Sequence, residues 1–134
     1  MMTQYLALDV GAARIGVALA NDVARIASPL PALENNQDFC DRLRELTAEH
    51  HIDQVIVGWP RGLNGQETDQ TRYVESFIER LDVCGIPVVK QDEALTSVQA
   101  EAELKSRGKP FAKGDIDSLS AVYILEDFLK GLPA

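Results

Sequence analysis

The chain has 134 residues, of which 46% are hydrophobic and 25% are charged. These are ordinary values for a globular domain with one hydrophobic core, and we expect a single domain over residues 1–134. The formal net charge of −8 argues against the broad basic surface that nucleic-acid-binding proteins usually carry. Clustered basic residues or a bound divalent cation would still permit such binding.

The sequence gives no sign of export or membrane insertion. Its start, MMTQYLALDV, has no basic segment before an apolar run, and no apolar stretch approaches the ~20 residues that cross a bilayer. The two cysteines, Cys40 and Cys84, are too few for a metal-ligand cluster or a disulfide framework, and we expect half-buried thiols. A soluble protein of the reducing cytoplasm is therefore expected.

The first half of the chain predicts three strands, a helix and a fourth strand. The strands at 4–9, 14–20 and 23–28 are joined by short turns, as in an antiparallel meander. Residues 36–51 place apolar side chains at helical spacing. The apolar run 54–58 after this helix is typical of a buried parallel strand.

The second half predicts a helix over 68–82 that Gly85 ends, and a strand at 86–89. A capping box at 96–99 begins a third helix, which Gly108 ends. The last helix is expected at 116–130. The order β-β-β-α-β-α-β-α-α indicates an α/β fold with a five-stranded mixed sheet, three antiparallel strands then two parallel ones, flanked by helices.

Three acidic residues stand where predicted elements end or begin. Asp9 ends the first strand, Glu93 follows the fifth strand together with Asp92, and Asp117 opens the last helix. Functional groups of open α/β sheets gather outside the carboxyl ends of the strands. We therefore expect Asp9 and Glu93 at one edge of the sheet, with Asp117 close by.

Three neighbouring carboxylates repel one another unless cations bind between them. Mg²⁺ prefers oxygen ligands, and two such ions ~4 Å apart can clamp a phosphodiester, one activating water and the other stabilising the leaving oxygen. Each acid alone also has a structural interpretation. Asp9 could accept hydrogen bonds from the turn that follows it, Glu93 could lie in a solvated loop, and Asp117 could cap its helix.

Several basic residues are candidate phosphate contacts. The densest run is KSRGKPFAK, residues 105–113, which is either a solvated surface or a nucleic-acid contact beside the acidic edge. The candidates are Arg14, Arg25, Arg61, Arg72, Lys105, Arg107, Lys109 and Lys113.

Four ordered blocks of the chain resemble motifs of the YqgF/RuvX family, bacterial proteins described as Holliday junction resolvases and as pre-16S rRNA nucleases. The blocks are LALDVGAARIGVALAN, VIVGWPRGLNGQET, KQDEALTSVQAE and GDIDSLSAVYILEDFL. The resemblance implies a ribonuclease H-like fold and a nuclease dependent on Mg²⁺ or Mn²⁺. Its implied substrate is the 5′ end of precursor 16S rRNA, with branched DNA as the alternative.

The resemblance also assigns residues. Asp9, Glu93 and Asp117 fall on the family's catalytic and metal-binding positions, and Arg14 and Asn64 fall on motif positions that we take as substrate-binding. Cutting both strands of a junction requires a symmetric dimer, and we expect a monomer or a weak homodimer. The further substrate-binding candidates are Arg61, Lys105, Arg107, Lys109 and Lys113.

The chain departs from the family pattern at Ala94, where the family has an arginine that can pair bidentately with phosphate or carboxylate. Ala12 and Ala13 also replace a common Thr and a basic residue, and the central loop is shifted in register. A non-catalytic nucleic-acid-binding regulatory module therefore stays open as an alternative. The first block also resembles a phosphate loop of actin-like ATPases, although those enzymes close two such domains around the nucleotide.

Overall fold

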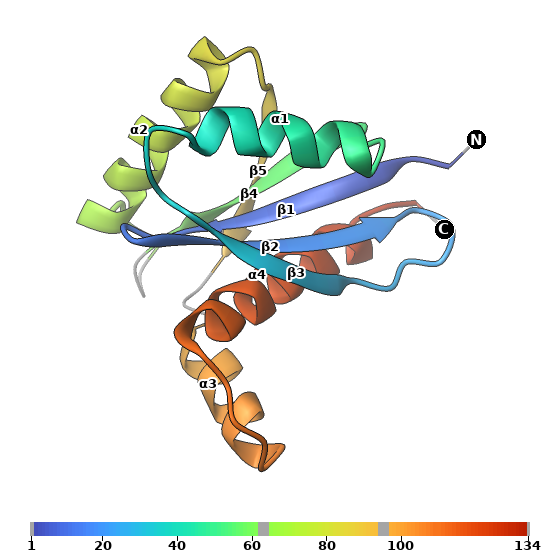
Figure 1. Ribbon diagram of the computed structural model, residues 1–134, viewed down its shortest axis with the longest axis vertical. Helices are drawn as coiled ribbons and strands as arrows, with labels where there is room; N and C mark the ends of the chain where they lie inside the picture. The colour runs from blue at the N-terminus through green and yellow to red at the C-terminus, as the bar shows by residue number, and fades with distance from the viewer. Residues whose placement is uncertain (1, 62–64, 94–96, 134) are drawn as a thin grey trace.

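A computed structural model of the chain describes residues 2–61, 65–93 and 97–133. Its centre is a five-stranded sheet in the order β3-β2-β1-β4-β5 (Figure 1). Strands β1 to β3 form an antiparallel meander, and β4 and β5 run parallel to β1, which confirms the predicted mixed sheet. The strands are β1 (Gln4–Val10), β2 (Arg14–Asn21), β3 (Ser28–Glu34), β4 (Gln54–Pro60) and β5 (Val88–Glu93).

The helices cover the two faces of the sheet unequally (Figure 1). Helices α1 (Phe39–Glu49) and α2 (Asp69–Val83) lie on one face, and α4 (Lys113–Lys130) lies on the other. Helix α3 (Ser97–Ser106) packs on α4 and extends away from the sheet. Within the described residues, no helix is long and apolar enough to cross a membrane.

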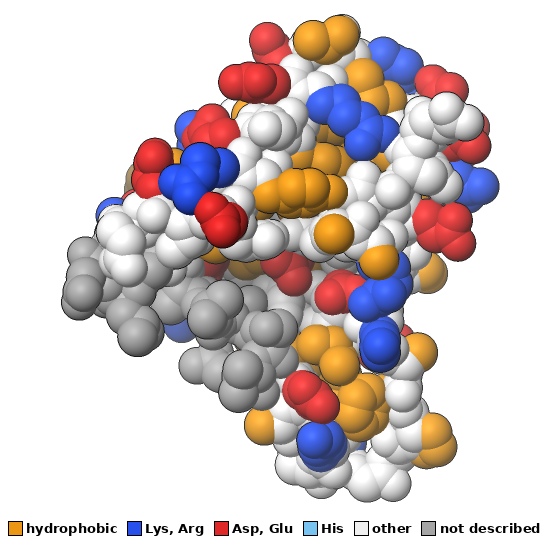
Figure 2. Space-filling view, turned by 90° about the vertical axis from the view of Figure 1, so that its left-hand side faces the viewer, with side chains coloured by type: hydrophobic (Ala, Val, Ile, Leu, Met, Phe, Trp, Pro, Cys, Tyr) orange, Lys and Arg blue, Asp and Glu red, His pale blue; other side chains and the backbone are white. Residues whose placement is uncertain are grey.

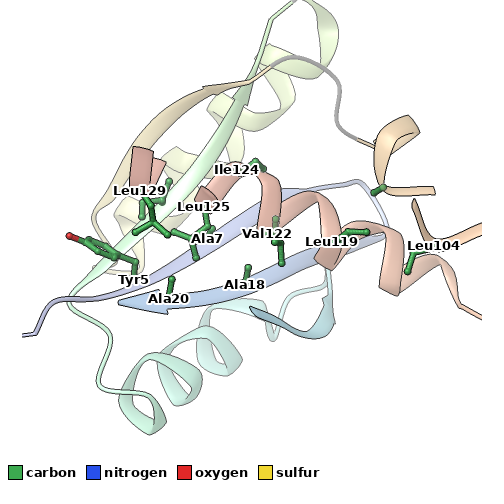
Figure 3. Packing of buried hydrophobic residues seen from close by; sticks show 13 residues of the cluster. Tyr5, Ala7, Ala18, Ala20, Leu104, Leu119, Val122, Ile124, Leu125 and Leu129 are labelled. Carbon is green, nitrogen blue, oxygen red and sulfur yellow. The ribbon is translucent and has the colours of Figure 1, made fainter. Parts of the chain in front are cut away.

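Alternation along β1 divides its side chains between two cores. Leu6 and Leu8 are buried with α1 and α2, whereas Tyr5 and Ala7 are buried with α4 (Figure 3). Because side chains alternate along a strand, Asp9 belongs to the face that α4 covers. The acid therefore stands between the sheet and the last helix.

The third strand is not at 23–28, as the sequence predicted, but at Ser28–Glu34. The segment before it turns, because the Asn21 side chain accepts hydrogen bonds from the backbone N–H groups of Val23 and Ala24, and Arg25 has a φ of 55°. The strand itself contains Pro29 and Pro31, which are tolerated because β3 is an edge strand.

Two further boundaries move residues of the predicted site. The fifth strand is displaced from 86–89 to Val88–Glu93, so Glu93 ends the strand instead of following it. The last helix begins at Lys113 instead of at residue 116, so Asp117 lies in its second turn and does not open it. Asp115 stabilises the N-terminus of this helix instead, since its Oδ2 accepts a hydrogen bond from the Ala112 N–H at 2.8 Å.

The predicted stop signals of α2 and α3 are confirmed. Gly85 and Gly108 follow these helices with φ values of +78° and +69°, in the left-handed region that favours glycine. The predicted capping box begins at Thr96, which lies outside the described residues.

The prediction of two free thiols is wrong, because Cys40 and Cys84 form a disulfide. Cys40 lies in α1 and Cys84 directly follows α2, and the two helices pack together through Phe39 and Phe77, whose ring centroids are 5.1 Å apart. The cysteines are 44 residues apart in the chain. Only the packing of α1 beside α2 brings them together.

Candidate active site

Asp117 is brought close to Asp9 by a close approach of α4 to β2. In the sheet Asp9 pairs with Gly16, and a Cβ atom on Gly16 would lie only 1.9 Å from the backbone oxygen of Asp117. The absence of a side chain at residue 16 therefore lets the second turn of α4 rest on the sheet. This contact brings Asp117 to the neighbourhood of Asp9.

The pKa of Asp9 is affected by this proximity to Asp117. The pKa of the Asp9 carboxyl is raised from 3.8 to about 7, mainly by burial under α4 and to a smaller extent by the negative charge of Asp117. An acid in this environment is held partly protonated near neutral pH. A positive charge bound beside it would relieve the same repulsion.

Asp117 already has one cationic partner. The Arg14 Nε donates a hydrogen bond to the Asp117 Oδ2 at 2.8 Å, and the two side chains are 38% and 22% exposed. Arg14 begins β2, so the ion pair joins this strand to α4 across the site. Arg14, which the sequence predicted as a substrate contact, therefore lies directly at the acids.

Glu93 reaches the same face from the end of β5. The pKa of its carboxyl is raised to about 8, mainly by burial. The smaller causes are, in order, a hydrogen bond with Asp127, the charge of Asp127, and the charges of Asp9 and Asp92. Its Oε1 is buried with no hydrogen-bond partner among the described residues. The structure thus joins Glu93 electrostatically to Asp9, as the parallel strands predicted.

Asp127 is a member of this group that the sequence analysis missed. It lies one turn beyond Ile124 on α4, and the Ile124 side chain would meet a Cβ atom on Gly58 of β4 at 2.4 Å. The same helix therefore carries Asp117 over β2 and Asp127 toward β5. Helical spacing from Asp117 could have suggested this residue only if the crossing direction of α4 had been known.

The carboxylates fit a hard divalent cation by their chemistry. They offer oxygen donors, one of which is buried without a partner, and their mutual repulsion favours a cation. In the described part of the chain, however, no three His, Cys, Asp or Glu side chains are grouped closely enough to hold a metal ion. Asp117 pairs with Arg14 and Glu93 faces Asp127, so cation binding requires both acids to leave these partners.

Three of the other predicted substrate contacts, Arg61, Lys105 and Arg107, form ion pairs with nearby acids. The Arg61 Nη2 lies 3.0 Å from the Asp92 Oδ2, at the shared end of β4 and β5. On α3, Lys105 pairs with Glu101 at 3.2 Å, and Arg107 pairs with Glu103 at 3.0 Å.

Two lysines of the basic run have no ion-pair partner among the described residues, and one further candidate is not described. Lys109 lies in the connection after α3, and Lys113 begins α4. Asn64 lies outside the described residues. The structure therefore brings Arg14 to the acids and leaves the basic run on α3 and on the connection to α4.

Figure 2 views the molecule from the side at which β1 ends, and acidic side chains are visible in the middle of that side. The five-stranded mixed sheet in this order, with helices on both faces, is a ribonuclease H-like fold. RuvC of Thermus thermophilus bound to a Holliday junction has the same fold, with a TM-score of 0.55 at 15% identity over 96% of this chain and 94% of that chain.

The chain belongs to the RuvX family, since the family described as "RuvX: Holliday junction resolvase" matches residues 3–131. A relative from Sulfurihydrogenibium, named "Putative pre-16S rRNA nuclease", is 36% identical over 98% of this chain and 92% of its own length. A relative of the same name from Anaeromyxobacter is 37% identical over 96% and 97%. The resemblance seen in the sequence is confirmed, and the family is one of nucleases.

Proposed function

We propose that this protein is a divalent-cation-dependent nuclease that hydrolyses phosphodiester bonds at the 5′ end of precursor 16S rRNA. The observation that supports the proposal is the electrostatic coupling of Asp9 with Asp117 and with Glu93 on the face of the sheet that α4 covers. Asp9 raises the pKa of Glu93, and Asp117 raises that of Asp9. The names of the relatives support RNA as the substrate.

Asp9, Glu93 and Asp117 are the residues that would hold Mg²⁺ or Mn²⁺. When bound there, such a cation supplies positive charge to the attacked phosphate and acidifies the attacking water. Protons compete with the cation for the same oxygens, so the raised pKa values of Asp9 and Glu93 weaken cation binding below about pH 7.

Arg14 has a second task in this proposal. Its guanidinium neutralises Asp117 while no cation is present, at an Nε–Oδ2 distance of 2.8 Å. If Asp117 held a cation instead, the guanidinium would be free beside the acids. It could then donate two parallel hydrogen bonds to a substrate phosphate, an arrangement that arginine forms readily.

The test is cleavage of a 5′-extended precursor 16S rRNA in the presence of Mn²⁺. Wild type is compared with Asp9→Asn and with the control Asp41→Asn, which removes an exposed carboxylate on α1, against the opposite face of the sheet. We expect wild type and the control to cleave equally. Asp9→Asn is expected to cleave more than about 100-fold more slowly. Loss of a residue that only supports a metal ligand costs up to about 100-fold, and Asp9 is proposed to bind the cation directly.

The other outcomes discriminate between the alternatives. Binding of the RNA without cleavage by any variant would establish the non-catalytic module instead. Equal cleavage by wild type and Asp9→Asn would show that the chemistry lies elsewhere.

Branched DNA is the second candidate substrate, because the family description names Holliday junction resolvases. A four-way DNA junction presented under the same conditions tests it. Faster cleavage of the junction than of the RNA, with a dimer in solution, would favour this function. A resolvase needs two symmetry-related active sites to cut both strands.

A further inference from the structure

A second feature of the molecule is a groove between the edge strand β3, the connection after α3 and the first turns of α4. It has a volume of about 600 Å³, within the range of small-ligand sites. Its floor is apolar, and Leu104 of α3 lies beside Leu119 of α4 there (Figure 3). The main apolar lining residues are Leu30, Leu104, Phe111, Leu119 and Val122.

The rim of the groove is cationic, in contrast to the net charge of −8 of the whole chain. Arg107 and Lys109 line it. Arg107 also pairs with Glu103 at 3.0 Å, whereas Lys109 has no ion-pair partner in the described ranges. The one acid in the lining, Asp115, accepts a hydrogen bond from the Ala112 N–H, so its charge is engaged at the positive N-terminal end of α4. The groove therefore combines an apolar floor with a rim that attracts anions.

The groove adjoins the acidic site through one residue of α4. Ser118 lines the groove, and it directly follows Asp117 in the chain. Its hydroxyl donates to the Leu30 backbone oxygen at 2.7 Å and accepts from the Val17 N–H at 3.3 Å, which ties α4 to β2 and β3. Asp117 and the lining of the groove are therefore adjacent along α4.

The edge strand argues against a peptide as the occupant. An extended peptide joins a sheet edge through backbone hydrogen bonds. Pro29 and Pro31 both line the groove, and neither has a backbone N–H to donate. Figure 2 shows hydrophobic side chains between charged ones on the lowest part of the molecule, where α3 lies. An apolar surface flanked by cations suits a nucleotide, with its flat base and its phosphate.

We propose that this groove binds an unpaired nucleotide of the RNA substrate, with the base against Phe111 and the adjacent phosphate on Arg107 and Lys109. The inference rests on the proposed nuclease function. If the groove binds a base, the substrate must be single-stranded where it crosses α4. A base in a duplex is stacked and paired and cannot enter the groove. The selectivity of the protein for unpaired RNA then resides on the side of α4 away from the acids.

The test is equilibrium binding, by fluorescence anisotropy without divalent cations, of a single-stranded RNA of about 12 nucleotides and of the same sequence as a duplex. Arg107→Gln is compared with Arg44→Gln. Each change removes one exposed positive charge and one ion pair with a nearby acid of the same chain segment. Only Arg107 lines the groove, whereas Arg44 lies on α1, against the opposite face of the sheet. Phe111→Leu keeps an apolar side chain and removes the aromatic ring.

We expect Arg107→Gln and Phe111→Leu to bind the single strand about fivefold or more weakly than wild type, as for the loss of one stacked base. Arg44→Gln is expected to bind like wild type, and Phe111→Leu to lose the preference for the single strand over the duplex. Circular dichroism of each variant confirms that it is folded.

Equal single-strand binding by Arg107→Gln and Arg44→Gln would overturn the proposal, as would an unchanged preference in Phe111→Leu. A concentration-dependent dimer that Phe111→Leu dissociates, with RNA binding intact, would assign the groove to a second copy of the chain. These failures are separable from failure of the nuclease function, because wild-type cleavage with Mn²⁺ is measured on the same preparation.

Discussion

Asp9 carries an electrostatic penalty in the folded protein that depends on pH. Its pKa is about 7 in the folded state against an ordinary value of 3.8, so between these values the folded state binds more protons than the unfolded state. The free energy of unfolding therefore falls as pH rises from about 4 to about 7, and the loss is complete above that range. Burial under α4 is the larger cause, and Asp117 is the smaller one.

Asp9→Asn removes this penalty, because an amide does not ionise. Without divalent cations, we expect the variant to be more stable than wild type by about 2–4 kcal/mol near pH 8. The difference should shrink as pH falls toward 4. Urea denaturation at several pH values measures it, and a stability difference that does not change with pH would contradict this account.

At the scale of single residues, the sequence identified the acids but not their partners. The positions of Asp9 and Glu93 at strand ends could be predicted, since strand direction follows from element order. The ion pair of Arg14 with Asp117 and the approach of Asp127 to Glu93 depend on how α4 crosses the sheet. No local pattern encodes that crossing angle.

At the scale of elements, the contact between α4 and the sheet depends on two glycines. A Cβ atom at Gly16 would meet the backbone oxygen of Asp117 at 1.9 Å, whereas one at Gly58 would meet the end of the Ile124 side chain at 2.4 Å. Backbone in a helix cannot withdraw without moving the helix, but a side chain can change its rotamer. The two positions therefore differ in tolerance although both are buried.

We expect Gly16→Ala to destabilise the protein by about 3 kcal/mol or more, at the upper end of overpacking effects, and Gly58→Ala by about 1–2 kcal/mol. Gly16→Ala should also weaken catalysis, because the displaced helix carries Asp117. Thermal unfolding and RNA cleavage of both variants provide the measurement. Equal destabilisation by the two changes would contradict the geometry described for α4.

Most of the elements could be predicted from periodicity, and the exceptions have physical reasons. Residues 23–26 are apolar enough to suggest a strand, yet the Asn21 side chain holds them in a turn. Residues 28–34 contain two prolines that disfavour a strand except at an edge, and edge position is a property of the assembled sheet.

At the scale of the whole molecule, the disulfide fastens α1 to the end of α2 on the face opposite the acids. It closes a loop across 44 residues that contains β4 and α2. Its formation could not be read from two cysteines so far apart. The predicted topology, in contrast, followed from element order alone.

Reduction of this disulfide is expected to lower the free energy of unfolding by up to about 4 kcal/mol, the chain-entropy value for a loop of this length. The acids lie beyond the other face of the sheet, so activity below the unfolding transition should change little. Denaturation and RNA cleavage with and without a thiol reductant measure both effects, with the double variant Cys40→Ser and Cys84→Ser as the control. A reductant effect that persists in the double variant would show that the disulfide is not its cause.

Our central proposal is that Asp9, Glu93 and Asp117 together bind a divalent cation, because the charge of Asp117 opposes ionisation of Asp9 and the charge of Asp9 opposes ionisation of Glu93. The most direct measurement is the melting temperature of wild type and Asp9→Asn near pH 8, with and without Mn²⁺. Binding at 100 times the dissociation constant stabilises a folded protein by about 2.7 kcal/mol. We predict a Mn²⁺-dependent rise of several degrees in wild type and little rise in Asp9→Asn. An equal rise in both proteins, or none in wild type, would contradict the claim.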